Sequence, residues 1–206
     1  MKLLAATRSA GKQREIQRIL SPSGFEIVFP GDVGLWETAA EAALELGESF
    51  EANARRKSEY FVSLSRMPTI ADDSGLEVLA LGGAPGVRSK RWAGASGTPL
   101  EVDAANNAEL VRRLTGAGES RRLARCRCVL VFLPSPGAVP TVSEGDCSGR
   151  ILQEPRGAAG FGYDPFFFSD ELGKTFGEAT DEEKDSVSHR GRALRALAIS
   201  LLTACR

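Results

Sequence analysis

Apolar and polar positions follow strand spacing in some parts of the chain and helix spacing in others. Residues 3–6 form a short apolar run, and residues 25–29 alternate between apolar and polar side chains, which predicts two strands. Residues 13–20 and 49–64 place their apolar side chains at helical spacing, so each predicts a helix with one buried face. The chain is therefore expected to begin with a strand, a loop and a helix.

The rest of the pattern predicts further elements of both kinds. Strands are expected at residues 76–81, 128–133, 141–151 and 166–168, and helices at residues 99–114 and 189–202. The strand at 141–151 would pair back on 128–133 as a hairpin partner, and residues 121–127 would be a basic, solvated approach. Residues 32–47 are rich in Ala and Glu and predict a partly helical segment without clear bounds.

Two adjacent carboxylates follow a buried strand. Residues 68–71 read as the end of that strand, and Asp72 and Asp73 come next, before a turn at Ser74 and Gly75. Carboxylates are rarely buried unless they are paired, protonated or bound to a metal, and adjacent like charges raise each other's pKa. A divalent cation would remove that cost, and ligands of α/β proteins gather at the carboxyl ends of strands. An Asp-rich turn with solvated side chains is the alternative.

The loop at residues 7–12 has the character of an anion site. It leads from a strand into a helix, whose N-terminus offers backbone N–H groups and positive charge, and Thr7, Ser9 and Lys12 add donors. It is not a Walker A loop, because Ala6 stands where that motif needs its first glycine. A turn that happens to contain a lysine is the alternative interpretation.

A glycine-rich segment at residues 157–165 surrounds two aromatic residues. Its small residues permit a close approach of the backbone, and the rings of Phe161 and Tyr163 could take a flat ligand on their faces. The alternative is a glycine-rich turn with core aromatics, since glycine is first of all a turn residue.

The helix predicted at residues 189–202, with Ser188 as its N-cap, carries the wrong charge at its start. His189, Arg190 and Arg192 lie in its first turn, and Lys184 lies just upstream. Helix N-termini favour negative charge by about 0.3–1 kcal/mol per group, so cations there indicate an anion or an electron-rich ligand among them. A single histidine is usually structural, but this surrounding favours a site.

Composition limits the class of protein. With 206 residues and 42% hydrophobic content, the chain predicts one domain, residues 1–206, with room for two lobes. A net charge of -1 gives no general attraction to nucleic acid or membranes, which favours a small-molecule partner. No stretch approaches the roughly 18 apolar residues of a membrane span and no signal peptide is visible, so a cytoplasmic protein is expected. Cys126, Cys128, Cys147 and Cys205 lack zinc-site spacing and predict buried free thiols.

Together these motifs resemble the inosine triphosphate pyrophosphatase (Ham1-like) family, whose members hydrolyse deaminated purine nucleoside triphosphates to the monophosphate and pyrophosphate. The matching segments are Thr7 to Lys12, Ser49 to Ala54 with Lys57, Ala71 to Leu76, Gly83 to Gly86, Phe161 to Pro165, and Glu183 and Lys184 followed by Ser188 to Gly191. The resemblance implies an α/β fold with an elongated, mixed, twisted sheet flanked by helices, two lobes with a nucleotide cleft between them, and a homodimer.

The resemblance also implies roles for individual residues. Asp73 would be the general base and would share Mg²⁺ with Glu45. The implied substrate contacts are Thr7, Arg8, Ser9, Ala10, Gly11, Lys12 and Lys57 for the triphosphate, Ser74, and Phe161, Gly162, Tyr163, Asp164, Lys184, His189 and Arg190 for the base. The family usually has Asn where this chain has Ser9, so the contact at that position would be shorter.

The implied reaction acts on ITP, dITP, XTP or dXTP. Water attacks the α-phosphorus, a carboxylate takes its proton and pyrophosphate leaves against the lysines. If the strand continues through Asp72 and Asp73, only one of them points to the substrate, and the resemblance favours Asp73. Donors on Lys184, His189 and Arg190 would meet the O6 atom of a 6-oxopurine and reject adenine by ~10⁴-fold or more.

Two other functions are compatible with the residues. One is a pyrophosphatase for other modified or pyrimidine nucleoside triphosphates, and the other is a nucleotide-binding module without turnover. A substrate comparison separates the first from the expected activity, and pyrophosphate release with Mg²⁺ or EDTA separates the second.

Overall fold

The computed structural model describes residues 1–204, which divide into two compact units. The first unit comprises Met1–Asp73, Cys128–Gly145 and the described residues from Arg190 onward, and the second comprises Ser74–Arg127 and Asp146–His189. Three of the four unit boundaries fall inside long strands and the fourth follows His189, the first residue of the last helix, and each unit has a hydrophobic core of its own.

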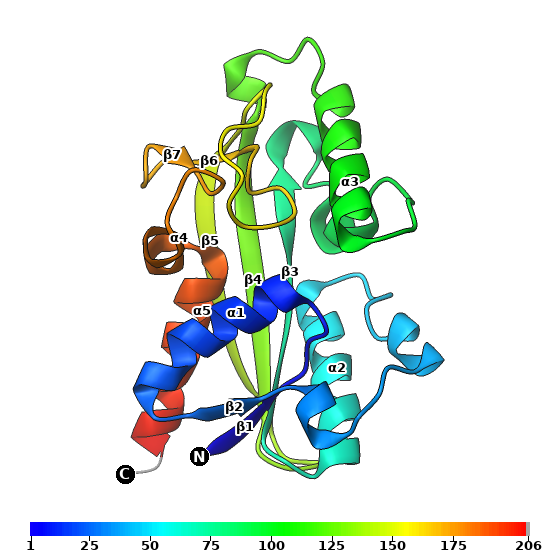
Figure 1. Ribbon diagram of the computed structural model, residues 1–206, viewed down its shortest axis with the longest axis vertical. Helices are drawn as coiled ribbons and strands as arrows, with labels where there is room; N and C mark the ends of the chain where they lie inside the picture. Colours follow the sequence, from blue (N-terminus) through cyan, green and yellow to red (C-terminus); the bar gives the residue numbers. More distant parts are fainter. Residues whose placement is uncertain (205–206) are drawn as a thin grey trace. The chain divides into compact units, whose positions relative to one another are not determined.

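One mixed sheet contains seven strands within residues 1–204, in the order β2-β1-β3-β4-β5-β6-β7 (Figure 1). The strands are β1 Lys2–Ala5, β2 Glu26–Val28, β3 Thr69–Val78, β4 Leu123–Leu133, β5 Thr141–Ile151, β6 Phe167–Ser169 and β7 Lys174–Thr175. β1 pairs in parallel with β2 and β3, whereas β6 pairs antiparallel with β5 and β7. The expected α/β fold with a mixed sheet flanked by helices is confirmed.

Five α-helices lie within the same residues. They are α1 Ala10–Leu20, α2 Phe50–Ser65, α3 Pro99–Arg113, α4 Asp181–Val187 and α5 His189–Ala204. The short 3₁₀ helices are η1 Ser21–Ser23, η2 Pro30–Val33, η3 Ala39–Ala43, η4 Leu79–Leu81, η5 Gly86–Arg91 and η6 Glu119–Arg121. None of the helices in the described chain is both long enough and apolar enough to cross a membrane.

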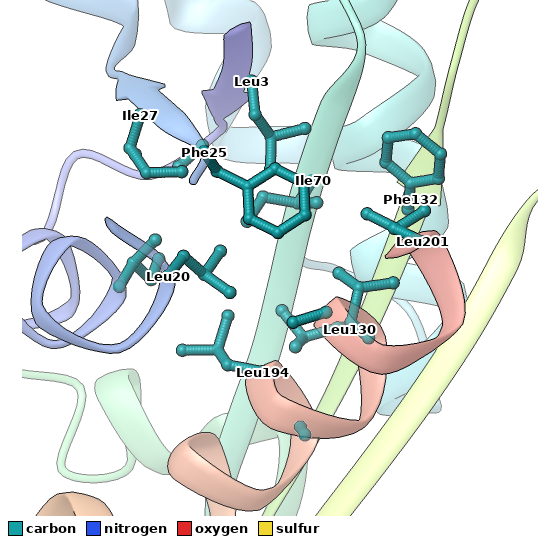
Figure 2. Close-up of a cluster of buried hydrophobic side chains, with 14 of the residues drawn as sticks. Leu3, Leu20, Phe25, Ile27, Ile70, Leu130, Phe132, Leu194 and Leu201 are labelled. Carbon is teal, nitrogen blue, oxygen red and sulfur yellow. The ribbon is translucent and has the colours of Figure 1, made fainter. Parts of the chain in front are cut away.

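The first unit buries apolar side chains on both faces of its strands. Leu3 and Ala5 pack in a cluster with α1 and α5, whereas Leu4 and Ala6 pack with Phe61 of α2. A strand covered on both faces needs apolar residues at successive positions, which explains the unbroken apolar run at the start of the chain. Figure 2 shows the cluster with α1 and α5, with Leu3, Leu20, Phe25, Ile27, Ile70, Leu130, Phe132, Leu194 and Leu201 labelled.

The second unit is built around α3 and the outer part of the sheet. Leu110 of α3 and the adjoining Leu114 are buried with Leu76 and Val78 of β3. Further members of this core come from the remaining strands and the segments that follow them: Ala124, Cys126, Cys147, Ile151, Phe167 and Phe176. This core supports the loops that carry the glycine-rich segment.

The prediction of buried free thiols is confirmed for the three cysteines that the structure describes. Cys126, Cys128 and Cys147 are buried free thiols. Cys205 lies outside the described residues.

Several predicted bounds were wrong. The expected turn at Ser74 and Gly75 is absent, because β3 runs through both residues and has β1 and β4 as its neighbours in the sheet, so tertiary pairing overrides the local turn preference. The separate strand at 76–81 is the end of β3 followed by a 3₁₀ turn. The basic approach at 121–127 is largely strand, since β4 begins at Leu123.

Candidate functional site

Asp72 and Asp73 both lie within β3, where successive side chains face opposite sides of the sheet. Asp72 follows the side of Ile70, which belongs to the cluster with α1 and α5. Asp73 follows the side of Ala71, which packs with α2. The two carboxylates therefore contact different helices, as the alternation predicted.

Asp72 is 2% exposed and is held by two cations. Its Oδ2 atom lies 2.9 Å from Lys12 Nζ and accepts hydrogen bonds from Arg190 Nε and Nη2 at 3.3 and 3.2 Å. Arg190 Nη1 also donates to the carboxylate of Glu15. α1 thus supplies Lys12 and Glu15, and α5 supplies Arg190.

The charges in this cluster stabilise one another. Burial alone would raise the pKa of Asp72, but Lys12 and Arg190 hold it well below its usual range. Burial also opposes the charge on Lys12, yet Asp72 raises the pKa of that ammonium. Against the same burial, Glu15 and Asp72 raise the pKa of Arg190. Asp72, Lys12 and Arg190 are therefore charged at neutral pH.

Glu15 helps to neutralise the cationic start of α5. Arg190 is the second residue of that helix, and the protein's own carboxylates, Glu15 and Asp72, offset the unfavourable helix dipole there. Sequence reasoning missed Glu15. The available signal was its spacing of three residues from Lys12, which places both side chains on one face of α1.

Asp73 lies on the side of β3 that faces α2. Its Oδ2 atom accepts a hydrogen bond from Asn53 Nδ2 at 2.8 Å, and Asn53 is fully buried. Burial raises the pKa of Asp73 against the opposing effects of Lys12, Lys57 and Asn53. A carboxylate with a raised pKa is better suited than an ordinary one to accept a proton near neutral pH.

Lys57 connects α2 to the loop before it. Its ammonium donates to the carboxylate of Glu45 and, at 2.9 Å, to the backbone oxygen of Asp72. Burial would raise the pKa of Glu45, but Lys57 and Lys12 lower it to about 2. Glu45 is therefore ionised at neutral pH, and its charge acts on Asp73.

The carboxylates suit a magnesium ion that arrives with a phosphate substrate. Within residues 1–204, no three His, Cys, Asp or Glu side chains are grouped as a metal site. Mg²⁺ usually keeps several waters and is bound by one or two carboxylates together with substrate phosphates. Glu45 and Asp73 supply oxygen ligands of that number and kind.

The expected phosphate loop, residues 7–12, follows β1 and includes the first turn of α1. Ser9 is the N-cap of α1 and accepts a hydrogen bond from the Lys12 N–H at 3.5 Å, so Ala10, Gly11 and Lys12 already belong to the helix. This corrects the predicted helix start at residue 13, because the Ser9 cap begins the helix earlier. The hydroxyl of Thr7 accepts from the Ser9 N–H at 3.2 Å. The loop therefore has a fixed conformation next to a helix N-terminus.

Arg8 directs its side chain to other protein groups. Its guanidinium donates to Glu41 and, at 2.8 Å, to the backbone oxygen of Leu35, and it lies over the Phe61 ring at 5.7 Å from the centroid. A phosphate contact at Arg8 would therefore use its backbone N–H.

In the second unit, the glycine-rich segment meets α4. Asp164 Oδ2 accepts hydrogen bonds from the Phe161 N–H at 2.7 Å and from Lys184 Nζ at 2.6 Å. The Lys184 ammonium also lies 4.7 Å from the centroid of the Phe161 ring. Lys184 is only 4% exposed, so Asp164 fixes both the ammonium and the backbone beside the ring.

Helix α3 and the 3₁₀ helix η5 bind the next residues of this segment. The Gly162 N–H donates to Asp103 at 2.8 Å, the Gly162 oxygen accepts from Asn107 Nδ2 at 2.9 Å, and the Tyr163 hydroxyl donates to the Ser89 backbone oxygen at 2.8 Å. Gly162 has a φ of +63°, a conformation that favours glycine. Sequence reasoning missed Asp103, which resembles any polar residue on an exposed helix face.

Two predicted site residues, Ser74 and His189, stand at the ends of the segments that form the second unit. Ser74 lies in β3 directly after Asp73, and His189 is the first residue of α5 and is 8% exposed. Ser188, before it, is the C-cap of α4 and has extended dihedral angles. The expected phosphate and metal residues thus lie in the first unit together with Arg190, and the other expected base contacts lie in the second.

Comparison with known proteins finds similarity over nearly the whole chain. The model of the Ham1 family matches residues 3–199. A dITP/XTP pyrophosphatase of Shigella flexneri is 43% identical over 197 residues, which cover 95% of each chain. A dITP/XTP pyrophosphatase of Methylococcus capsulatus is 45% identical over 201 residues, which cover 97% of this chain and 96% of the relative.

Solved structures agree with the sequence comparison. A HAM1 protein from Coxiella burnetii is similar with a TM-score of 0.84 at 32% identity, covering 98% of this chain and 99% of that one. A nucleoside-triphosphatase, or dITP/XTP pyrophosphatase, from Mycobacterium abscessus has a TM-score of 0.72 at 43% identity, covering 96% and 98%. By sequence over nearly its full length and by fold, the chain belongs to the Ham1 family.

Proposed function

We propose that this protein hydrolyses deaminated purine nucleoside triphosphates, ITP, dITP, XTP and dXTP, to the monophosphate and pyrophosphate. The full-length similarity to dITP/XTP pyrophosphatases supports the substrate class. The observation that carries the chemistry is the cluster in the first unit, where half-buried Lys12 and buried Lys57 lie beside the carboxylates Glu45, Asp72 and Asp73. Such a cluster suits a polyanion and a divalent cation together.

In this proposal, Glu45 and Asp73 would hold Mg²⁺, and the ion would neutralise charge on the phosphates and orient them. The N–H groups of residues 7–12 and the side chains of Thr7, Ser9 and Lys12 bind the triphosphate at the N-terminus of α1. Lys57 provides a second phosphate contact beside Glu45. Arg8 contributes through its backbone, because its guanidinium is engaged by Glu41.

Asp73 is the proposed general base. It accepts a proton from a water molecule as the water oxygen bonds to the α-phosphorus, and the bond from that phosphorus to the bridging oxygen breaks. The leaving pyrophosphate takes the electron pair of the broken bond, and Lys12 and Lys57 stabilise its charge. The hydrogen bond from Asn53 Nδ2, at 2.8 Å, holds the Asp73 carboxylate in place for this role.

The second unit is proposed to contact the base. Phe161 stacks on the purine, Gly162, Tyr163 and Asp164 lie beside it, and Ser74 contacts the substrate. Lys184 and His189 donate to the O6 atom of a 6-oxopurine, whereas adenine would leave these donors unpaired. Arg190 is proposed as a further base contact, with its guanidinium oriented by Glu15 and Asp72.

We further propose that residues 1–206 act as one nucleoside triphosphate pyrophosphatase domain, that the protein is a homodimer, and that it works in the cytoplasm on the nucleotide pool. The family relationship supports these three statements. Light scattering of the purified chain tests the dimer, because a dimer has twice the mass of the single chain.

The experiment that tests the function is a rate comparison of ITP, XTP, GTP, ATP, dUTP and dTTP with Mg²⁺, following pyrophosphate. We expect kcat/KM for ITP or XTP to exceed that for ATP by about 10⁴-fold. A preference for a pyrimidine triphosphate would instead support the alternative substrate class. Binding of ITP without release of pyrophosphate would indicate a nucleotide-binding module.

A further inference from the structure

We propose that Asn53 is a positioning residue, whose single side chain amide joins the Asp73 carboxylate to the loop that carries Glu45. The inference rests on the proposed function, since it assigns a task within that site. Every residue it uses belongs to the first unit, and Asn53 lies on α2 (cyan in Figure 1).

The two ends of the amide make different hydrogen bonds. Asn53 Nδ2 donates to Asp73 Oδ2 at 2.8 Å, and Asn53 Oδ1 accepts from the Gly47 N–H at 2.7 Å. Of the two ends of the amide, only the oxygen can accept from a backbone N–H and only the NH₂ group can donate to an ionised carboxylate, so the partners define the orientation of the amide. Asn53 is 0% exposed, so water does not compete at either end.

The loop approaches Asn53 so closely that a side chain would not fit. A Cβ atom added at Gly47 would lie 2.6 Å from Asn53 Oδ1 and 3.0 Å from Arg56 Nη1. Gly47 does not have a positive φ, so the backbone conformation itself would permit alanine. Glycine is therefore required here by the contact with Asn53.

α2 holds this loop at two points. Asn53 binds the backbone at Gly47, and Lys57, one helical turn later, binds the carboxylate of Glu45 two residues before it. The same Asn53 amide binds Asp73. A shift of the loop would thus move Glu45 relative to Asp73, and Asn53 binds both the loop backbone and the Asp73 carboxylate.

The first test measures the link in protein without metal or substrate. Hydrogen exchange of residues 44–49 is followed in the wild type, in Asn53→Ala and in Gly47→Ala. We expect the N–H of residue 47 to exchange at least about 10-fold faster in both variants, because its acceptor is removed in Asn53→Ala and displaced in Gly47→Ala. Unchanged exchange in Asn53→Ala would overturn the proposal.

Ser58→Ala is the matched control. Ser58 is also fully buried on α2, and its hydroxyl makes no hydrogen bond within residues 1–204. It therefore tests removal of a buried polar group from the same helix without breaking the link. Circular dichroism shows whether each variant is folded, and Gly47→Ala keeps the proposal testable if Asn53→Ala does not fold.

The second test separates positioning from a general loss of structure. For Asn53→Ala we expect kcat with ITP to fall about 10–100-fold and the Mg²⁺ concentration for half-maximal rate to rise, as for other groups that orient metal ligands. KM for ITP should change less, because the phosphate and base contacts remain. Wild-type kcat and Mg²⁺ dependence in Asn53→Ala would contradict the positioning role.

Failure of the proposed function gives a different result. In that case the wild type releases no pyrophosphate from any triphosphate, whereas the exchange measurement on the metal-free protein still decides whether Asn53 links the loop to Asp73.

Discussion

Asp72 and Asp73 are adjacent in the sequence but interact with different side chains. Asp72 is buried between Lys12 and Arg190, whereas Asp73 accepts from the neutral amide of Asn53. Cations lower the pKa of Asp72, and burial raises that of Asp73. Alternation along β3 was predictable from the sequence, but the partners of each carboxylate were not, because they come from segments distant in the chain.

This difference predicts that one of two matched substitutions lowers stability and the other abolishes turnover. Asp72→Asn should lower the free energy of unfolding by about 3–5 kcal/mol, because it leaves buried cations without their carboxylate. Asp73→Asn should change it by less than about 1 kcal/mol, since one buried hydrogen bond is of that size, while abolishing ITP turnover. Urea unfolding and pyrophosphate release measure the two effects. A stable Asp72→Asn protein, or an active Asp73→Asn enzyme, would contradict this assignment.

Cys128 gives a prediction for alkaline pH. Burial raises the pKa of its thiol to about 12, whereas an unfolded thiol titrates near 8.5. Between these values the unfolded chain loses a proton that the native state keeps, so stability present below pH 8 declines as pH rises. Between pH 7 and 10, the free energy of unfolding should fall by about 1–2 kcal/mol more in the wild type than in Cys128→Ala. Urea unfolding under reducing conditions measures this, and equal pH dependence in both proteins would refute it.

At the scale of elements, helices bring the site residues together on β3. α1 supplies Lys12 and Glu15, α2 supplies Asn53 and Lys57, and α5 supplies Arg190. The strongly periodic helices and the strand at 141–151 were predicted closely, because their apolar faces are clear in the sequence. α4 and β7 were not predicted, since both are short. A capping box at Thr180 and Glu183 was the signal for α4.

The contact of α3 with the glycine-rich segment predicts an effect on substrate binding. Asn107 binds the Gly162 oxygen, so Asn107→Ala should loosen the segment proposed to contact the base. We expect KM for ITP to rise about 10-fold, the loss of roughly one hydrogen bond, with the Mg²⁺ requirement unchanged. Ala108→Ser, at an exposed position of the same helix, is the control. A changed Mg²⁺ requirement in Asn107→Ala would contradict the assignment of α3 to the base end.

At the scale of the whole molecule, the family relationship and the mixed sheet agree with the fold expected from the motifs. Most residues of the candidate site were named from the motifs, since each motif combines charge or glycine with a strand or helix end. They could not show Glu15, Asp103 or the link made by Asn53. Such residues become visible only when distant segments meet, because their own sequence positions look like ordinary helix residues.

Removal of metal should affect activity and not the fold. The proposed magnesium ligands are two carboxylates, Glu45 and Asp73, and Mg²⁺ held by so few protein groups is usually bound together with substrate phosphates. EDTA should abolish pyrophosphate release from ITP while the melting temperature of the free protein changes by less than about 2 °C, a shift smaller than that of 1 kcal/mol in a chain of this size. A large loss of thermal stability in EDTA would indicate a structural metal instead.

Hydrolysis of ITP in water enriched in ¹⁸O tests most directly where the phosphate chain is cut. Because the proposed water attacks the α-phosphorus, mass spectrometry should find one ¹⁸O atom in the inosine monophosphate and none in the pyrophosphate released with it. Label in pyrophosphate, or release of inorganic phosphate and IDP, would contradict the account.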